Sequence, residues 1–335
     1  MTLLPSDEPD LDARALRVVR AVSELGSMTA AAAALGYSQP AVSQQLKRLE
    51  GRLGMPVVER AGRGVRLTEA GEILARHAIT VTMALDAAAG ELTELRGLRS
   101  GLVRIAAFPS ASAAIVPGLL SRIAQTHPGI TITYVEAEPP EAVQTVRENR
   151  ADLAITFSYP GDRVDPHRES AHGLSVRTLG KDGMRIVLPV GHRLAAVAAV
   201  ELADLAGENW IGGCPRCRGH LLQLCDRRGF TPRISFETDN VAAVLGLVES
   251  GIGVAMLPVL AIGTVGVRSG VAILPTTGGD SRTLHAVTAV GADRIPAVAA
   301  TLRQLAAQVD AAQVDAAQVD VAQVDGAGGR DIAGA

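Results

Sequence analysis

The sequence has few aromatic residues, few cysteines and no long apolar run. Of 335 residues only 4 are Phe, 3 are Tyr and 1 is Trp, so the cores must be built mainly from Ala, Val, Leu and Ile. Three cysteines in so long a chain exclude a secreted scaffold that depends on disulfides. No uncharged apolar stretch reaches the ~18 residues that a membrane-spanning helix requires, so we expect no membrane partner.

The N-terminus lacks the features of an export signal. Residues 1–10 are acidic and contain proline, without a basic start followed by an apolar run. We therefore expect a disordered N-terminal segment on a cytoplasmic protein. A chain of 335 residues has room for two or three domains, and its net charge of −3 requires any nucleic-acid-binding surface to be local.

Common catalytic motifs are also absent from the sequence. It contains no Gly-x-Ser-x-Gly, no phosphate loop and no His-Glu-x-x-His. The carboxylates of Glu136 and Glu138 lie beside a Pro-Pro turn, where we expect a solvated strand end. The Cys-Pro-Arg-Cys run lies inside a larger predicted α/β domain, whereas a thioredoxin-like role would need a compact domain of its own. We therefore expect neither an enzyme nor a cofactor.

Residues 26–54, GSMTAAAAALGYSQPAVSQQLKRLEGRLG, predict two helices joined by a tight turn at Gly36. Ser27 can cap the first helix, and Ser38 or Gln39 can cap the second, with Pro40 tolerated in its first turn. The second helix has an apolar inner face formed by Val42, Leu46 and Leu49. This arrangement is typical of a helix-turn-helix.

The outer side of the second helix carries small, amide and basic side chains. Such residues suit insertion into the major groove, because amides pair with adenine edges and basic groups reach phosphates. The expected DNA contacts of this helix are Ser38, Gln39, Pro40, Ala41, Ser43, Gln44, Lys47, Arg48 and Arg52.

Residues 59–68 predict a wing, a glycine-containing hairpin with basic side chains. Its alternate arginines, Arg60, Arg63 and Arg66, are expected to face the DNA backbone. Between Ala41 and Ala70, six Lys and Arg against three Glu give a local charge of +3 in an acidic chain. The positive charge is thus concentrated where DNA contact is predicted.

Residues 16–71 resemble the N-terminal domain of LysR-type regulators. The resemblance is carried by GSMTAAAAALGYSQPAVSQQLKRLEGRLG and by VVERAGRGVRLTEAG that follows it. Val19 stands where the family often has Phe, and Val57-Val58 where it often has Leu-Phe, so packing differs but not the fold. The resemblance implies a winged helix-turn-helix (all-α with a small wing) at 11–69, a linker helix at 70–99 that pairs two subunits, and an effector-binding domain at 101–305.

From Gly101 onward short β-rich runs alternate with helical segments, which favours βαβ units and a largely parallel sheet. Strands are expected at 102–108, 130–135, 152–157, 184–189, 233–238, 253–258 and 283–290. Helices are expected at 111–125, at 141–149 and from about Ile295, with a loop at 158–175. By resemblance, this α/β effector domain consists of two periplasmic-binding-protein-like subdomains, 101–174 with 275–305, and 175–274.

Ligands in such domains bind near strand C-terminal ends and helix N-termini. Ser110 and Ser112, with free backbone N–H groups, would suit a small carboxylate or another anion, although both serines could instead only cap a helix. The expected effector-binding residues are Ser110, Ala111, Ser112, Phe157, Ser158, Gly213, Cys214 and Asp239.

Three roles remain open for the cysteines. They can be structural or pocket-lining thiols, a redox site of Cys214, Cys217 and Cys225 activated by nearby arginines, or zinc ligands together with His220. If Cys217 and Cys225 share one helix, their separation of about 12 Å is too great for a disulfide or a zinc site. Cys214 and Cys217 can meet locally.

Residues 306–335 form a low-complexity tail of four AAQVD-like pentapeptides and a final segment. Five residues advance an ideal helix by about 500°, so the repeat creates no single apolar face. We expect a frayed helical or disordered tail.

We expect a regulator that binds double-stranded promoter DNA at an interrupted inverted repeat, as dimers that pair into tetramers and can contact RNA polymerase. A small-molecule effector would close the two subdomains and change DNA bending. The alternatives are a redox-sensing regulator that uses its cysteines, and a small-molecule-binding protein with a vestigial DNA-binding domain. The local positive charge and the intact Ser-Gln-Pro-Ala-Val-Ser run argue against the last.

Overall fold

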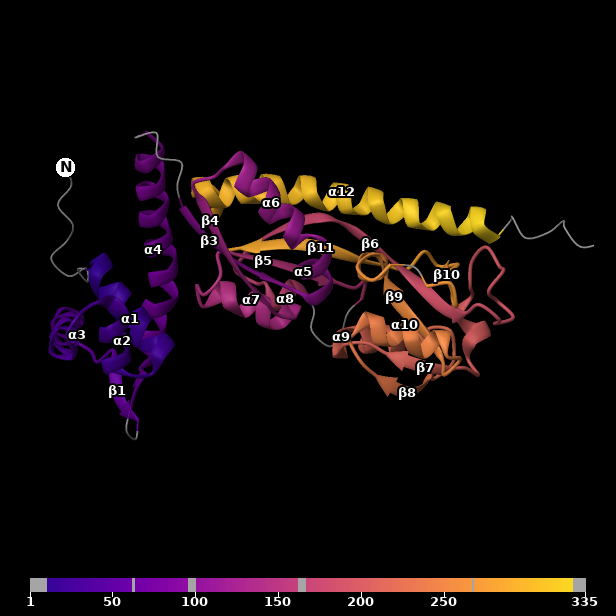
Figure 1. The fold of residues 1–335 in the computed structure, drawn as a ribbon. Coiled ribbons are helices and arrows are strands. Elements are labelled where there is room, and N and C mark those ends of the chain that lie inside the picture. Colours follow the sequence, from indigo (N-terminus) through magenta and orange to yellow (C-terminus); the bar gives the residue numbers. More distant parts are fainter. Residues whose placement is uncertain (1–10, 62–63, 96–100, 162–166, 267, 328–335) are drawn as a thin grey trace, which may run out of the picture. The chain divides into compact units, whose positions relative to one another are not determined.

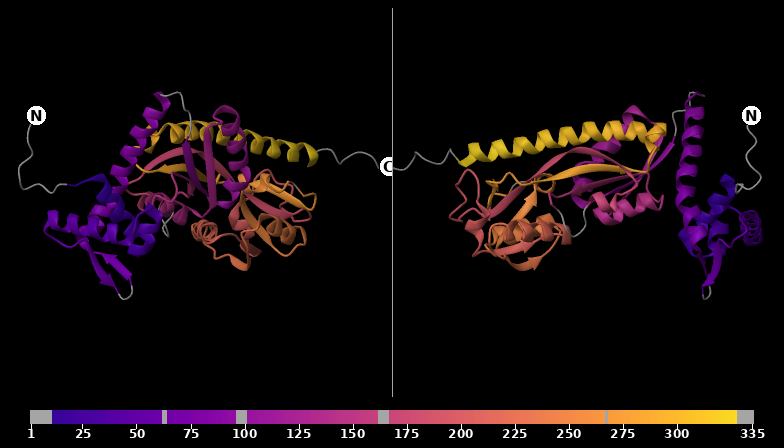
Figure 2. Two further views of the ribbon diagram at one scale, coloured as in Figure 1. Left: turned by 60° about the vertical axis from the view of Figure 1, so that its left-hand side comes forward. Right: turned by 180° about the vertical axis from the view of Figure 1, so that it is seen from behind.

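The computed structural model describes residues 11–61, 64–95, 101–161, 167–266 and 268–327. Two compact units follow each other along the chain, a helical N-terminal unit and a larger α/β unit (Figures 1 and 2). Among the described residues, no helix is both long and apolar enough to cross a membrane.

Helices and one hairpin make up the N-terminal unit. The elements are α1 (Ala13–Leu25), α2 (Met28–Leu35), α3 (Gln39–Leu53), β1 (Val58–Ala61), β2 (Gly64–Leu67) and α4 (Glu69–Leu95). Side-chain oxygens of Asp12, Ser27 and Ser38 accept hydrogen bonds from backbone N–H groups three residues on, and so cap α1, α2 and α3. Ser38, not Gln39, is therefore the cap of α3.

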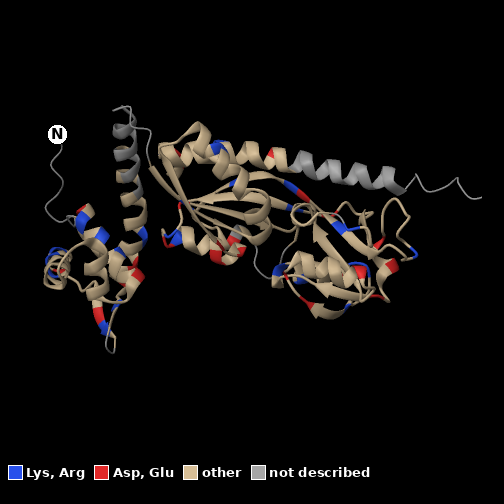
Figure 3. Ribbon diagram, in the orientation of Figure 1, with Lys and Arg blue, Asp and Glu red and all other residues tan. Residues whose placement is uncertain are grey.

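One hydrophobic core holds the helices of this unit together. Val42, Leu46 and Leu49 of α3 are at most 1% exposed, which confirms the predicted inner face of this helix. They share the core with residues of α1, α2 and α4, among them Leu16, Val19, Ala31 and Leu74. Because the apolar side of α3 is buried, its polar side faces outward; Figure 3 shows basic residues along α3 and on the hairpin.

The second unit is built on a nine-stranded sheet with the order β4-β3-β5-β11-β6-β9-β7-β8, in which β10 also pairs with β6. Its strands are β3 (Gly101–Ala107), β4 (Ile130–Glu136), β5 (Leu153–Ser158), β6 (Ser175–Pro189), β7 (Asn209–Gly212), β8 (Arg233–Glu237), β9 (Val254–Pro258), β10 (Val271–Pro275) and β11 (Ser281–Thr288). Its helices are α5 (Pro109–Ala114), α6 (Val116–Thr126), α7 (Pro139–Arg147), α8 (His167–Ser170), α9 (Pro215–Asp226), α10 (Val241–Glu249), α11 (Val259–Gly263) and α12 (Pro296–Ala327), with short 3-10 turns at Leu202–Leu205 and Ala292–Arg294.

The long strand β6 divides this unit into two lobes. Its first half pairs with β11 in a lobe that also contains β3, β4 and β5, and its second half pairs with β9 and β10 in a lobe completed by β7 and β8. In the first lobe, α6 and α12 cover one side of the sheet and α7 and α8 the other (Figures 1 and 2). The carboxyl ends of β3 and β5 point toward the junction of the lobes.

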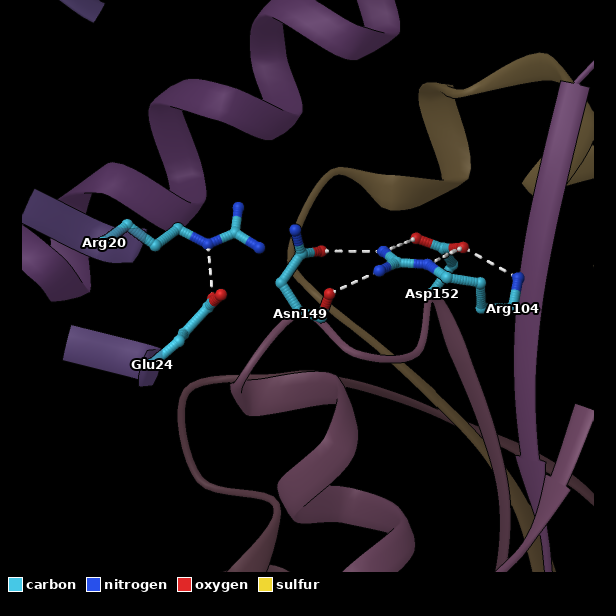
Figure 4. Close-up of polar contacts among 5 residues, drawn as sticks. All are labelled: Arg20, Glu24, Arg104, Asn149 and Asp152. Atoms are coloured by element: carbon cyan, nitrogen blue, oxygen red, sulfur yellow. Dashed lines mark hydrogen bonds and ion pairs between the residues drawn. The ribbon is translucent and has the colours of Figure 1, made fainter. Parts of the chain in front are cut away.

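Arg104 links two neighbouring strands of the first lobe, β3 and β5 (Figure 4). Its guanidinium donates to both carboxylate oxygens of Asp152 and to the backbone oxygen of Asn149, which has a left-handed φ of 54°. Because Arg104 lies on β3 and Asp152 immediately precedes β5, these bonds fix the parallel register of β3 and β5. The same figure shows the Arg20–Glu24 ion pair within α1.

The structure differs from the sequence-based expectation in several elements. The helix expected at 111–125 is two helices, α5 and α6, that meet at Ile115, because Pro117 cannot donate to a carbonyl four residues back. β6 begins at Ser175, nine residues before the expected strand, since Gly180, Asp182 and Gly183 weaken its strand pattern. β7 and β10 were not expected, the 158–175 segment includes α8, and α12 continues through the repeats to Ala327.

Candidate functional site

The outer surface of α3 is the candidate DNA interface. Gln44, Lys47 and Arg48 are exposed on it, together with Ser38, Gln39, Pro40 and Arg52 at its two ends. Ala41 and Ser43 are half-buried, and Arg60 and Arg66 are exposed on the hairpin strands β1 and β2. Arg63 lies outside the described residues. The fold thus brings the expected helix residues to one solvent-facing side.

Ion pairs reduce the positive charge that this surface offers to phosphates. Arg52 donates to Asp12 at 2.7 Å, and Arg66 contacts Glu59 across the hairpin at 2.6 Å. Within the described part of the chain, Lys47, Arg48 and Arg60 have no carboxylate partner. These three cations are therefore the strongest candidates for phosphate contacts, whereas Arg52 and Arg66 would first have to leave their partners.

A second site lies where the two lobes of the α/β unit meet. It concentrates three of the few aromatic residues of the chain beside a buried ion pair and a pair of thiols. We name it the lobe-junction cluster, and it consists of Phe108, Ser110, Phe157, Tyr159, Asp182, Cys214, Arg216, Cys217, His220 and Arg282.

Arg282 is the central charge of this cluster. It is 2% exposed, its Nη2 lies 2.8 Å from Asp182 Oδ2 and donates to Ser110 Oγ at 2.7 Å, and its guanidinium carbon lies 4.8 and 4.5 Å from the ring centres of Phe108 and Phe157. Asp182 in turn accepts from the backbone N–H of Leu260 in α11. The Arg282–Asp182 pair therefore links a helix of the first lobe to a helix of the second.

Stacked rings and sulfur contacts make a second link between the lobes. Tyr159, one residue beyond β5, stacks on His220 of α9 with ring centres 3.9 Å apart, and its hydroxyl donates to Cys217 Sγ at 3.6 Å. Phe157 meets Tyr159 edge to face at 5.4 Å. Tyr159 also lines a cavity of about 560 Å³ beside Ser158, His167 and His285.

Several expected effector-binding residues converge on this cluster, and others do not. Ser110, Phe157 and Cys214 belong to it, and Gly213 lies against Cys217. Ser112 is committed to its own lobe, because its N–H donates to Phe108 O and its hydroxyl to Ala107 O; the free N–H expected there is absent. Ser158 contacts His285 at 2.8 Å. Ala111 is buried, and Asp239 is exposed.

The two carboxylates at the end of β4, Glu136 and Glu138, correct a second expectation. Glu136 is exposed as expected, but Glu138 is half-buried, and its Oε2 has no hydrogen-bond partner among the described residues. Burial, with the nearby Cys217 sulfur, raises the pKa of Glu138 to about 7. Glu138 is thus an acid of the junction rather than part of a solvated strand end.

The cysteines do not form one cluster. Cys214 caps α9, and its sulfur lies 2.7 Å from that of Cys217. Cys225 is near the other end of the same helix, two turns from Cys217, so the four-ligand zinc arrangement is not formed. Within the described ranges, no group of three or more metal-ligating side chains converges.

Sequence reasoning missed Arg282, Asp182, Tyr159 and Glu138. No local motif marks the first two, which become partners only through the antiparallel register of β11 and β6, a hundred positions apart in sequence. Tyr159 could have been found as the aromatic residue directly after the expected Phe157-Ser158 pair.

Comparison with known proteins agrees with both halves of this structure. Residues 13–72 match the family described as bacterial regulatory helix-turn-helix protein, lysR family, and residues 96–310 match the LysR substrate binding domain. The regulator BudR of Raoultella terrigena is 30% identical over 254 residues, which cover 74% of this chain and 84% of BudR. A probable hydrogen peroxide-inducible genes activator of Mycobacterium avium is 32% identical, over 76% of this chain and 80% of that protein.

Solved structures show the same fold. A full-length OxyR variant from Pseudomonas aeruginosa has a TM-score of 0.67 at 19% identity, with 90% of this chain and 95% of that chain covered. HinK from the same organism has a TM-score of 0.53 at 25% identity, with 90% and 99% covered. The predicted resemblance and the predicted winged-helix and α/β fold are thereby confirmed. The chain belongs to the LysR family of bacterial helix-turn-helix regulators, and it is a DNA-binding transcription regulator with an effector-binding domain, not an enzyme.

Proposed function

We propose that this protein binds an interrupted inverted repeat in a promoter, as dimers that pair into tetramers, and that a small carboxylate or another small anion acts as its effector at the lobe-junction cluster. Effector binding changes how far the two lobes close, and thereby the bend of the DNA. This role places the protein in the cytoplasm, beside RNA polymerase.

The observation that carries the effector assignment is one unused donor of a buried cation. Arg282 Nε and Nη2 are taken by Asp182 and Ser110, whereas Nη1 has no acceptor among the described residues. An anionic oxygen that accepted a hydrogen bond from this N–H would gain a charge-assisted contact with the guanidinium. Arg282 donates to Ser110 of the first lobe, and Asp182 accepts from Leu260 of the second. An anion bound to Arg282 would therefore affect the contact between the two lobes.

The DNA assignment rests on the exposed side of α3. Gln44 is placed to contact base edges, and Lys47, Arg48 and Arg60 are placed to contact phosphates. Dimer formation through α4 is supported by Ile73, Val81 and Leu85, which are 42%, 37% and 41% exposed on that helix. Apolar side chains of this size, left exposed along one helix, favour a partner helix.

A gel-shift titration on DNA upstream of the protein's own gene tests the DNA role. We expect binding that weakens steeply with salt, because phosphate contacts release counterions. The double variant Gln44→Ala/Lys47→Ala should lose specific binding while it stays folded. If specific binding persists, α3 is not the recognition helix, and if no salt-dependent binding occurs, the vestigial-domain alternative gains support.

A thermal-shift screen with small carboxylates and inorganic anions tests the effector role. A genuine effector should raise the Tm of the wild type but not that of Arg282→Lys, whose single ammonium cannot replace the guanidinium fork. Arg268→Lys is the matched control, because Arg268 pairs with Glu249 on an exposed surface of the second lobe. Equal shifts in all three proteins would place the ligand elsewhere.

A further inference from the structure

Glu138 is an acid of the lobe junction whose carboxyl group is not used by the fold. Its Oε2 atom is buried and has no hydrogen-bond partner among the described residues. Glu138 directly precedes α7, but its side chain makes no capping bond to that helix. A buried carboxyl oxygen without a partner is unfavourable, because it has lost its contacts with water and gained none in return. This oxygen is therefore available to a ligand.

The strand register places Glu138 beside the helix that carries Ser110. β3 and β4 run parallel and end at the same level, and the backbone N–H of Ala137 donates to Ala107 O at 2.9 Å, which continues the pairing beyond β4. The next residue, Glu138, is therefore level with the start of α5. Ser110 of α5 in turn accepts from Arg282 at 2.7 Å. The acid thus lies near the central cation of the lobe-junction cluster.

Charged groups of both lobes surround the Glu138 carboxyl group. Burial and the Cys217 sulfur of α9 raise its pKa to about 7, Arg282 acts in the opposite direction, and Glu141 of α7 and Asp239 after β8 add to the rise. Only Arg282 among these neighbours is a cation, and its ion pair is formed with another carboxylate. Glu138 therefore has negative neighbours in both lobes and no cation of its own.

The two unused groups have opposite requirements. Nη1 of Arg282 has no acceptor among the described residues, and Arg282 is 2% exposed. The Glu138 carboxylate lacks a donor, and the terminal torsion of a glutamate is broad, so either oxygen can turn toward a ligand. A plain anion bound to Arg282 would be repelled by an ionised Glu138. A ligand that also carries an ammonium group removes this repulsion and supplies the missing donor.

We propose that the effector is an amino acid, whose carboxylate binds Arg282 and whose ammonium group donates to Glu138. This inference rests on the proposed function, because it names the chemical class of the effector at the lobe-junction cluster. Asp239 of the second lobe adds negative charge on the side of the ammonium group. The ligand cation therefore attracts a carboxylate from each lobe, and in its absence the two carboxylates repel each other.

Isothermal titration calorimetry of the full-length protein with matched ligand pairs tests the assignment. The probes are the standard amino acids, β-alanine and 4-aminobutyrate, each compared with the carboxylic acid that lacks its amine. We expect at least one amino acid to bind about tenfold or more tightly than its amine-free partner, because a charge-assisted hydrogen bond is gained and a repulsion is removed. If the amine improves binding in no pair, the inference is wrong.

Glu138→Gln keeps the size of the side chain but cannot ionise. This variant should bind the selected amino acid about tenfold or more weakly than the wild type does, and the amine-free acid at least as tightly. Glu136→Gln is the matched control at the exposed end of β4, and it should leave both affinities unchanged. Equal affinity of the wild type and Glu138→Gln for the amino acid would show that the ammonium group binds elsewhere.

Proton exchange on binding reports the charge state of Glu138. With a pKa of about 7 in the free protein, the carboxyl group is about half protonated at about pH 7, so an ammonium group that ionises it should release about half a proton per site. An amine-free acid should instead cause proton uptake, because its negative charge raises the pKa of Glu138. Titrations in two buffers of different ionisation enthalpy measure both numbers. Proton uptake with the amino acid, or equal release from Glu138→Gln, would contradict the inference.

Arg282→Lys separates this inference from the proposed function. If amine-free acids bind the wild type more tightly than they bind Arg282→Lys, and the amine adds nothing, the proposed anion site stands and the amino-acid inference fails. If both members of each pair bind the two proteins equally, the site itself is wrong. Binding that requires Arg282 for both members of a pair, and Glu138 for the amino acid alone, is the expected result.

Discussion

Arg282 and Asp182 face each other on neighbouring strands and form an ion pair that is almost completely shielded from water. Their Nη2 and Oδ2 atoms are 2.8 Å apart, and each side chain is 2% exposed. The aspartate also accepts a backbone hydrogen bond from α11, and the arginine donates to α5. This single pair thus connects both lobes of the effector domain at the place where β6 passes from one to the other.

Removal of one partner of this pair should destabilise the fold strongly. We expect Arg282→Met or Asp182→Leu to lower the free energy of unfolding by about 3–5 kcal/mol, because each leaves a buried charge without its partner. The double variant Arg282→Met/Asp182→Leu should recover much of the loss, since no buried charge remains. Urea denaturation of the wild type, the two single variants and the double variant measures these free energies of unfolding. If the loss in the double variant equalled the sum of the two single losses, the two residues would not be coupled.

Lys47 and Arg52 should differ in their effect on DNA binding although both are basic residues of α3. Lys47→Ala should reduce the slope of log affinity against log salt by about 1, because one phosphate contact is lost. Arg52→Ala should reduce it less, because Arg52 is already paired with Asp12 at 2.7 Å. Salt titrations of the gel shift measure both slopes, and equal reductions would show that the Arg52–Asp12 pair opens on DNA.

Gly71 allows close contact between α4 and the segment before β1. A Cβ at this position would lie 2.2 Å from the backbone oxygen of Val57, so Gly71→Ala should destabilise the N-terminal unit by about 1–3 kcal/mol. A Cβ at Gly51 in α3 would contact no other atom, so Gly51→Ala should stabilise the N-terminal unit by about 0.5–1 kcal/mol through its higher helix propensity. Thermal denaturation of both variants measures these two changes in stability. An unchanged Tm for Gly71→Ala would show that α4 can shift to make room for the added methyl group.

Glu138 should make stability depend on pH. Its pKa is raised from 4.5 to about 7 in the folded protein, so the folded state holds the proton more tightly and stability decreases as the pH rises through this range. Glu138→Gln removes the decrease, and we expect it to gain about 1–2 kcal/mol over wild type at about pH 8, after allowance for partial solvent screening, with little gain at about pH 4. Glu136→Gln, at an exposed position, is the control, and parallel curves for all three proteins would contradict the prediction.

The local sequence predicted the structure correctly wherever the interactions of a segment lie within that segment. Ser27 and Ser38 cap the helices that the sequence predicted, and Val42, Leu46 and Leu49 are buried as their spacing required. The antiparallel pairing of β1 with β2 also agrees with the predicted wing. In these cases the partners of each residue are its near neighbours in the chain, so periodicity and capping chemistry suffice.

Prediction was weaker where a residue finds its partner far away in sequence. The serines after β3 were expected to offer free donors, yet Ser112 bonds within its own lobe and Ser110 is engaged by Arg282. The first half of β6 was not expected as a strand, because its glycines and polar residues lower its intrinsic strand preference and pairing with β11 overrides that preference.

The sequence by itself determined the family, the helix-turn-helix, the exposed side of α3 and the proximity of Cys214 to Cys217, since each depends on spacing within one or two helical turns. Only the tertiary structure decided that Arg282 meets Asp182, that Tyr159 donates to Cys217, and that Glu138 is half-buried. These contacts join strands, helices and lobes that are distant in the chain. The strength of these contacts depends on burial and on the exclusion of water. Neither is encoded in a local sequence pattern, because both depend on which surfaces the whole fold brings together.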